Sequence, residues 1–143
     1  MRAIQTFEVS LKAFIVRDGK ALFVRESDTG YWELPGGRID VGEEWAAHTV
    51  VLAREIREEL GAHFQVALHS EVVTWTRQRP TDNRFLFLVA RFGEAAGADE
   101  PALSSEHDAY AWHNLDAARA LHFPERSGYV GGIEALWRLL PKR

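Results

Sequence analysis

The chain has 143 residues, 46% of them hydrophobic and 27% charged, which favours one globular domain over residues 1–143 and excludes a disordered or fibrous protein. A net charge of −4 argues against binding to duplex nucleic acid, and the absence of cysteine excludes disulfides, thiolate metal sites and a cysteine nucleophile. The sequence predicts neither a signal peptide nor a membrane span, so we expect a cytoplasmic protein with no membrane partner. The oligomeric state is left open, with a homodimer as one alternative.

The first half of the chain predicts a β-hairpin, a glycine turn and a helix. Apolar, β-branched runs at 9–16 and 21–24 flank Asp18-Gly19, which is a turn signal. Residues 31–34 fit a short strand that ends at Pro35-Gly36-Gly37. Helical spacing of apolar residues then predicts a helix over about 46–60.

The second half of the chain alternates strands and helices. The predicted elements are a strand at 64–76, a polar turn at 77–84, a strand at 85–92, an acidic loop at 93–101, a short strand at 110–112, a helix after the N-cap Asn114 and a C-terminal helix at 133–140. Such a mixture predicts an α/β sandwich rather than a helical bundle or a β-barrel.

Three glutamates share one face of the predicted helix at 46–60. Glu55 lies three and four residues before Glu58 and Glu59, so the three carboxylates repel each other. A solvated acidic face, paired with neighbouring arginines, is one interpretation. A divalent cation is the other, because magnesium and manganese prefer carboxylate oxygens.

The segment before the helix favours the cation. Here the chain resembles the Nudix (MutT-like) hydrolase family, whose motif runs Gly, five residues, Glu, seven residues, Arg-Glu-apolar-X-Glu-Glu-X-Gly-apolar. Gly37, Glu43 and the run from Arg54 to Ala62 match its defined positions. The resemblance implies a Nudix-type α/β/α sandwich with a mixed β-sheet. It also implies metal-dependent hydrolysis of a pyrophosphate bond in a nucleoside-diphosphate-linked small molecule.

The resemblance also implies roles for individual residues. Glu55 and Glu59 are the expected metal ligands, with Glu58 shared between ions or acting through water, and the carbonyl of Gly36 is an expected backbone ligand. Arg54 is expected to orient the carboxylates. Mg²⁺ is the expected ion and Mn²⁺ an alternative, while zinc is not expected because no nitrogen or sulfur cluster accompanies the carboxylates.

The chain departs from the family pattern at one place. Ten residues, 44–53, separate Glu43 from Arg54, where the pattern has seven. No helix breaker occurs between Ala46 and His48, so we expect the helix to start near Ala46 and Glu43 to lose its contact with Arg54. The rival is a longer loop with Thr49 as the N-cap.

A second candidate site is the run from Glu106 to Trp112. It resembles a Glu-His-X-X-Tyr-X-Trp segment of some family members, in which a loop glutamate approaches the metal site. Glu106 is therefore a candidate ligand or general base, with an exposed loop acid as the alternative. His107 is expected to be solvated.

Substrate contacts are the least defined by the sequence. Arg25, Trp32 and Gly37 are candidate substrate-binding residues, although packing is an alternative for Trp32. A polar turn carries Arg77, Arg79 and Arg84, for which solvation is favoured over an anion site. A nucleoside triphosphate or dinucleoside polyphosphate is the favoured substrate, and a non-catalytic nucleotide sensor is the alternative function.

Overall fold

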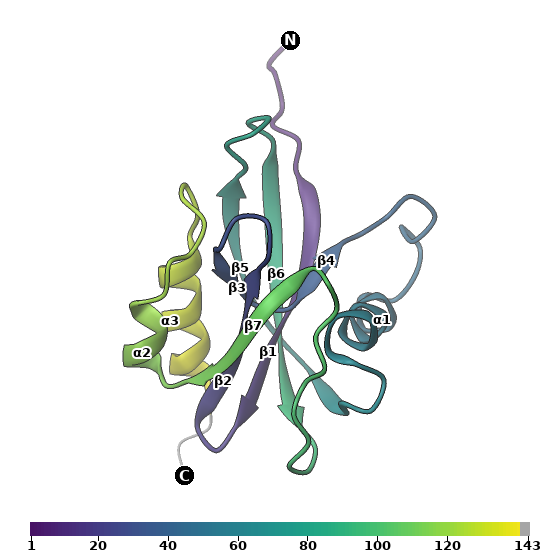
Figure 1. Cartoon of the computed structure of the whole chain (residues 1–143). Coiled ribbons are helices and arrows are strands. Elements are labelled where there is room, and N and C mark those ends of the chain that lie inside the picture. The colour runs from purple at the N-terminus through teal and green to yellow at the C-terminus, as the bar shows by residue number, and fades with distance from the viewer. Residues whose placement is uncertain (141–143) are drawn as a thin grey trace.

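In the computed structural model, which describes residues 1–140, a mixed seven-stranded sheet lies between helices on its two faces (Figure 1). The strands are β1 (Glu8–Arg17), β2 (Lys20–Glu26), β3 (Trp32–Glu33), β4 (Gly36–Arg38), β5 (Val66–Gln78), β6 (Phe85–Ala95) and β7 (His107–His113). They run in the order β3-β2-β1-β6-β5, with β4 also pairing with β1 and β7 with β2. The predicted α/β sandwich with a mixed sheet is confirmed.

Strand β1 is the centre of this arrangement. It pairs with β2 through the predicted hairpin, where Asp18 and Gly19 adopt positive φ angles of 52° and 76°, and it pairs in parallel with β6. Because side chains alternate along a strand, Leu11, Ala13 and Ile15 point to one face, while Phe14 points to the other. The hairpin prediction from the apolar runs is therefore confirmed.

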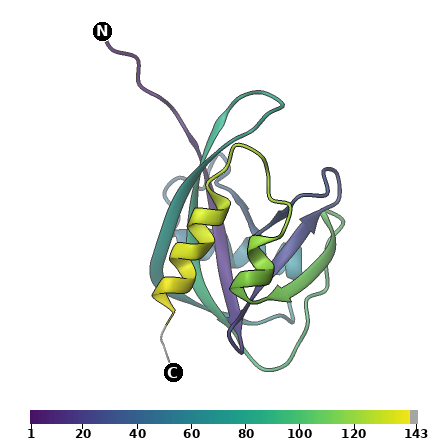
Figure 2. The same cartoon turned by 90° about the vertical axis from the view of Figure 1, so that its left-hand side faces the viewer.

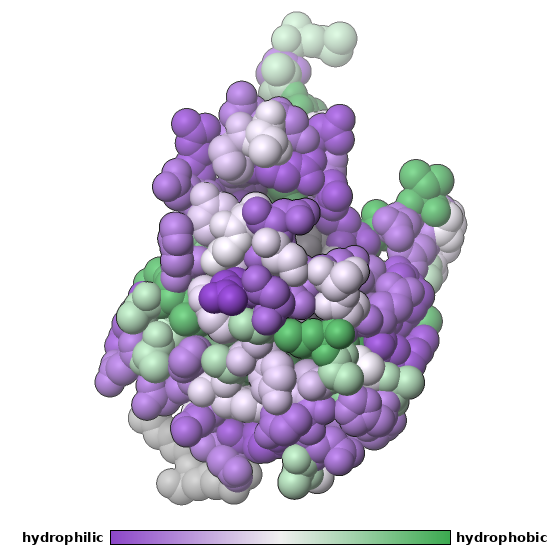
Figure 3. All heavy atoms as spheres, viewed as in Figure 1, coloured by the Kyte–Doolittle hydropathy of each residue, from purple (hydrophilic) through white to green (hydrophobic). Residues whose placement is uncertain are grey.

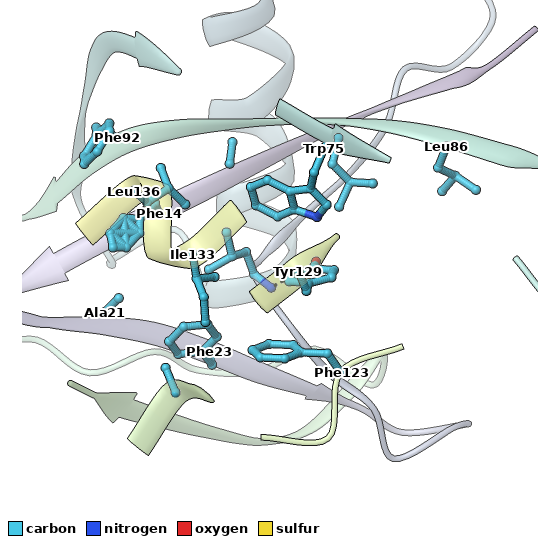
Figure 4. Packing of buried hydrophobic residues seen from close by; sticks show 14 residues of the cluster. Phe14, Ala21, Phe23, Trp75, Leu86, Phe92, Phe123, Tyr129, Ile133 and Leu136 are labelled. Carbon is cyan, nitrogen blue, oxygen red and sulfur yellow. Dashed lines mark hydrogen bonds between the residues drawn. The ribbon is translucent and has the colours of Figure 1, made fainter. Parts of the chain in front are cut away.

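Helix α1 (His48–Leu60) covers the first face, and α2 (Leu115–Arg119) and α3 (Tyr129–Leu139) cover the second (Figures 1 and 2). The core under α3 is aromatic: Phe14, Phe23 and Tyr129 are fully or almost fully buried (Figure 4). Asn114 caps α2 by accepting a hydrogen bond from the backbone N–H of Ala117, as its position predicts. No helix within residues 1–140 is long and apolar enough to cross a membrane.

The segment between β4 and α1 differs from the expectation. Helix α1 begins at His48, two residues after the expected start at Ala46, and its N-cap Ala47 has no side-chain cap bond. Residues 40–47, here called the arm, project from the body of the protein instead (Figure 1). The end of the arm is hydrophobic, as the green spheres there show (Figure 3). Val41 and Trp45 in the arm are 101% and 95% exposed. A projecting loop therefore takes up most of the added length, which costs little because closure entropy rises slowly with loop length.

Several other boundaries also differ from the expectation: β5 spans Val66–Gln78 instead of 64–76, β6 ends at Ala95 instead of Phe92, and α3 begins at Tyr129 instead of Ile133. Gly36 and Gly37 were expected to end a strand, but they form β4, which pairs with β1 through Leu11 and Lys12. Strand β7 begins at His107 rather than at Tyr110, because β2 pairs with it as far as Glu26. Both additions are made by partners distant in sequence, which local patterns do not reveal.

Candidate functional site

A cleft of about 510 Å³ opens on the sheet face that carries α3, at the end that this helix leaves uncovered. Its floor is formed by β1 and β6, and its walls by the chain around Glu26, Gly36 and Glu106. Charged side chains dominate the lining. In the described chain it brings together two of the predicted carboxylates, Glu59 and Glu106, with the glycine turn and the loop before β7.

Glu59 reaches this cleft from the last turn of α1. Its side chain is 3% exposed, and Oε2 accepts a hydrogen bond from the backbone N–H of Gly36 at 2.9 Å. Gly36 has a φ of 140°, and a Cβ there would collide with the carbonyl oxygen of Leu11. A Cβ on Gly37 would lie 2.7 Å from the carboxylate of Glu55. Gly36 is therefore needed for β4 to pair with β1, and Gly37 for Glu55 to approach β4.

The loop before β7 brings Glu106 and His107 to the same point. Ser104 donates its backbone N–H to the carbonyl of Glu59, and Ser27 donates to the carbonyl of Glu106. Oxygen or nitrogen atoms of Glu59, Glu106 and His107 then lie within 4.8 Å of one another. Glu106 is exposed, whereas Glu59 and His107 are buried. The functional interpretation of Glu106 is strengthened by this grouping.

His107 is not the solvated loop histidine that the sequence favoured. It is 5% exposed, its Nε2 donates to Glu33 at 3.1 Å, and its Nδ1 lies 3.5 Å from Glu59 without a hydrogen-bond partner. Burial would lower the pKa of His107, but the bond to Glu33 and the charge of Glu59 raise it. Its strand pairing with Glu26 turns the ring inward, which a single histidine in a sequence cannot indicate.

A buried ion pair lies beside these residues. Lys12 Nζ donates to Glu33 at 2.9 Å, and the two side chains are 8% and 12% exposed. Burial opposes ionisation of Glu33, but the charge of Lys12 and the bond from His107 lower its pKa to about 2. Burial also raises the pKa of Glu59, to about 8, although Lys12 and His107 act against it. Glu59 is thus a carboxylate whose surroundings lack enough positive charge.

Arg54 organises the outer side of α1. Its guanidinium donates to Glu43 at 2.8 Å, to Glu55 at 3.2 Å and to Glu58 at 3.1 Å. The expectation that Glu43 loses Arg54 is therefore wrong, because the arm folds back far enough to keep the contact. The side chain of Glu58 is 59% exposed and turned toward Arg54, so the structure does not bring it to Glu59 and Glu106.

Glu55 lies between these two groups. It contacts Gly37 and Arg54, and burial raises its pKa against the effect of Arg54, with Glu58 and Glu106 adding to the rise. The carboxylate of Glu55 does not line the cleft. Glu59 and Glu106 therefore form the carboxylate group at the cleft, while Glu55 lies one helical turn before Glu59 and is bonded to Arg54.

This donor set fits a divalent cation. Buried carboxylates with raised pKa values are stabilised by a bound positive charge, and Mg²⁺ and Mn²⁺ accept such oxygens. The unpaired Nδ1 of His107 adds a nitrogen beside the carboxylates, contrary to the expectation that none accompanies them. Zinc also accepts nitrogen, so the argument against zinc from the sequence is weaker than expected.

The candidate substrate residues divide into two groups. Gly37 lines the cleft, whereas Arg25 and Trp32 do not. Arg25 is bound to Asp108 at 2.7 Å, and its guanidinium carbon lies 5.8 Å from the centre of the Trp32 ring. Arg77 does line the cleft, although solvation was favoured for it.

Lys12 and Glu33 are site residues that the sequence did not single out. They are 21 positions apart, and the sequence pattern of β1 is equally compatible with an exposed lysine. The one available signal was a lysine inside a run of apolar residues, with Leu11 and Ala13 beside it. An isolated charge in a strand is more often solvated than buried, so that signal alone identifies nothing.

Comparison with known proteins agrees with the geometry. The NUDIX domain family matches residues 7–131. A Bacillus subtilis (strain 168) protein described as "Putative 8-oxo-dGTP diphosphatase" is 34% identical over 113 residues, which cover 79% of this chain and 70% of that protein. A MutT-like protein of Streptomyces ambofaciens is 33% identical over 109 residues, covering 76% of this chain and 64% of the relative.

The fold is similar to that of solved relatives. The solution structure of the E. coli ORF135 protein superposes with a TM-score of 0.70 at 25% identity, covering 94% of this chain and 91% of that one. The motif residues at Gly37, Glu43 and Arg54 to Ala62, the sandwich around the sheet and the family match over most of the chain all agree. The chain therefore belongs to the NUDIX domain family of hydrolases, which act on pyrophosphate bonds of nucleotide substrates.

Proposed function

We propose that this protein is a metal-dependent hydrolase that cleaves a pyrophosphate bond in a nucleoside triphosphate or a dinucleoside polyphosphate. The observation that carries the proposal is the grouping of Glu59, Glu106 and His107 at one end of the cleft, with Glu55 one helical turn before Glu59 on α1. A pyrophosphate is anionic and resists attack by water. A site that collects uncompensated carboxylates can bind such a substrate only together with cations.

The surroundings of each residue indicate its proposed role. Glu59 and Glu55 are the proposed ligands, with the carbonyl of Gly36 as a further candidate, and Mg²⁺ or Mn²⁺ held there would neutralise phosphate charge and lower the pKa of bound water. Glu106 is exposed at the cleft and fits the part of a general base or a further ligand. His107 donates to Glu33 and faces Glu59, so its proposed role is to hold the carboxylates in place.

Arg54 acts at a distance from the substrate in this proposal. It binds Glu43, Glu55 and Glu58 at once, which fixes the rotamers of the carboxylates on the outer side of α1. Glu58 faces solvent beside Arg54, so it reaches the substrate only through a water or a second ion. Arg54 is accordingly a positioning residue, and its loss should act through Glu55.

The test is a substrate screen combined with a metal series. Nucleoside triphosphates, 8-oxo-dGTP and dinucleoside polyphosphates are incubated with Mg²⁺, Mn²⁺, Zn²⁺ or excess chelator, and phosphate and pyrophosphate are measured separately. We expect turnover with Mg²⁺ or Mn²⁺ and none with chelator. Full turnover in chelator contradicts the metal mechanism, and nucleotide binding without turnover under any metal supports the sensor alternative.

A further inference from the structure

The cleft has two ends of opposite character. The acidic end contains Glu59, Glu106 and His107, and the arginine end contains Arg77 on the edge strand β5. Strands β1 and β6 separate β4, where Glu59 is bonded, from β5. Three strand spacings of roughly 4.8 Å put the two ends about 14 Å apart. A ligand that fills the cleft therefore has an anionic end and a distant end of different chemistry.

Arg77 is a guanidinium without a partner. Its Nε is buried and makes no hydrogen bond, and no carboxylate within residues 1–140 forms an ion pair with it, although its charge acts on Glu26, which also lines the cleft. The other arginines that line the cleft are paired: Arg38 with Glu8 at 2.7 Å, and Arg79 with Asp82 at 2.6 Å. A buried donor without an acceptor costs about 1–3 kcal/mol, so an acceptor from a ligand would stabilise this position.

The backbone holds Arg77 in place. Arg77 is the register partner of Leu86 on β6 and forms a bridge with Ser127, ahead of α3. Its neighbour Gln78 donates its backbone N–H to the carbonyl of Arg126. Because the backbone of Arg77 is fixed by pairing on both sides, ligand binding restricts only its side chain. An arginine in a loop would lose backbone conformational entropy as well, so this position favours specific recognition.

The floor beside Arg77 is apolar. Leu86 and Leu88 line the cleft and are 6% and 1% exposed, so the floor offers packing and no hydrogen bonds. A planar heterocycle lying on such a floor presents its polar edge outward, toward the wall. The guanidinium at that wall has only donors, in a fixed fork, and it therefore matches two adjacent acceptors.

We propose that Arg77 is a specificity residue that reads the base of the nucleotide. It donates two hydrogen bonds to an edge with a carbonyl oxygen beside an unprotonated ring nitrogen, as guanine and cytosine offer and adenine does not. Adenine places an amino donor beside its ring nitrogen, which repels the fork. The inference rests on the proposed function for the assumption that a nucleotide fills the cleft, but it concerns binding alone.

The experiment measures binding without turnover. GMP, CMP and AMP, which contain no pyrophosphate bond to cleave, are titrated calorimetrically into the whole protein in the presence of Mg²⁺. We expect GMP and CMP to bind tighter than AMP by about 5- to 150-fold, which corresponds to 1–3 kcal/mol for a bidentate contact. Arg77→Met should abolish this preference by weakening GMP and CMP binding while leaving AMP binding unchanged.

Two further variants separate base recognition from charge. Arg77→Lys keeps the positive charge but loses the planar fork, so it should lose most of the preference. Arg84→Met is the matched control, because Arg84 is exposed, bound to Glu8 and outside the cleft lining. It should bind all three nucleotides as the wild type does, and circular dichroism spectra check that each variant is folded.

Three results overturn the inference: no preference in the wild type, an equal loss for GMP and AMP in Arg77→Met, or full preference in Arg77→Lys. An equal loss would mean that Arg77 attracts the phosphate by charge, and full preference in Arg77→Lys would mean that a single charged donor, without the planar fork, is enough at the base edge. A wild type that binds none of the three monophosphates at millimolar concentration overturns it as well. A protein that prefers GMP and CMP through Arg77 but hydrolyses no nucleotide would disprove the proposed function and leave the inference intact.

Discussion

Lys12 and Phe14 lie two residues apart on the same face of β1, but their surroundings are opposite. Phe14 is fully buried, with its ring centre 5.3 Å from that of Phe92 and 4.9 Å from that of Trp137. Lys12 is 6% exposed and bonded to Glu33 in the floor of the cleft. Helix α3 begins at Tyr129 and covers only one end of the sheet face. One strand therefore supplies both the apolar core and the charged site, and the extent of α3 separates them.

The two regions are stabilised differently. The core under α3 is stabilised by the removal of apolar surface from water. The charged groups of Lys12, Glu33 and Glu59 lose hydration on burial, and only their interactions with one another offset that cost. Replacement of a buried ion pair by apolar groups is often neutral, while removal of one partner is costly. The cleft is thus a place where the fold gives up packing to hold charge, which points to a functional rather than a stabilising role.

The core side of this contrast is tested by Phe14→Ala. We expect a loss of about 3–5 kcal/mol in the free energy of unfolding, because a fully buried aromatic ring leaves a cavity. The turnover of the protein that remains folded should change little, since Phe14 does not line the cleft. Urea denaturation and a nucleotide assay on the same preparation measure both. A loss below about 1 kcal/mol would show that the core relaxes to fill the cavity.

The charged side is tested by Lys12→Met. We expect a loss of about 3 kcal/mol, because Glu33 then stays buried with only His107 as its partner. The double variant Lys12→Met with Glu33→Gln should recover at least half of the loss, as no unpaired charge is left. Urea denaturation of the three proteins gives the coupling. Equal stability of the single and double variants would show that water reaches Glu33.

The Lys12–Glu33 pair also predicts that the protein loses stability in acid. The folded-state pKa of Glu33, about 2, lies below the ordinary value of 4.5, so its ionisation stabilises the fold above about pH 4.5 and this contribution disappears as pH falls toward 2. The double variant lacks the carboxylate and should lose less stability over that interval than the wild type. Unfolding free energies measured from neutral pH down to the acid limit of the native state compare the two.

The sequence allowed the sandwich and the motif to be predicted, because they depend on local information. The hairpin around Asp18-Gly19, the helix face with Glu55 and Glu59 and the cap at Asn114 all follow from spacing and turn chemistry. The resemblance to the family then placed these parts in one fold. Nothing in that argument needed a contact between distant residues.

The parts that were missed depend on such contacts. Lys12, Glu33 and His107 meet through β1, β3 and β7, and the inward position of His107 follows from its pairing with Glu26 on β2. Glu43 keeps Arg54 because the arm folds back, and the apolar spacing of the helix gave no sign of that. Spacing along a chain does not fix the path of a loop, so the expected loss of this contact was wrong.

The proposed metal ligands of the charged cleft are tested by substitutions on α1. Glu59→Gln and Glu55→Gln should each lower turnover by at least about 100-fold, since each removes a proposed metal ligand. Unfolding free energy should not fall for Glu59→Gln, because burial disfavours the charge that the change removes. Glu58→Gln is the matched control on the same helix and should cost less than about tenfold, because its side chain is 59% exposed beside Arg54. Equal losses at Glu58 and Glu59 would reassign the ligands.

A smaller effect is expected at Glu43. The carboxylate receives two N–H groups of Arg54, at 2.8 and 3.2 Å, and through Arg54 it supports Glu55. Glu43→Gln should therefore lower turnover by about 2- to 5-fold, as solvent-accessible ion pairs contribute modestly. Steady-state kinetics should show the change in kcat with KM little altered. No change at all would mean that Arg54 holds Glu55 without help from Glu43.

The smallest effect is expected at the end of the arm. Trp45 is 95% exposed and belongs to neither the core under α3 nor the cleft, so Trp45→Ser should change the free energy of unfolding by no more than about 0.5 kcal/mol. Turnover should also stay near that of the wild type, because the backbone that carries Glu43 to Arg54 is held by hydrogen bonds on both sides of Glu43. A clear loss of stability that grows with protein concentration would instead show that the arm packs against a second molecule. The arm would then be a third region of this fold, with its apolar residues exposed in the monomer and buried in an assembly.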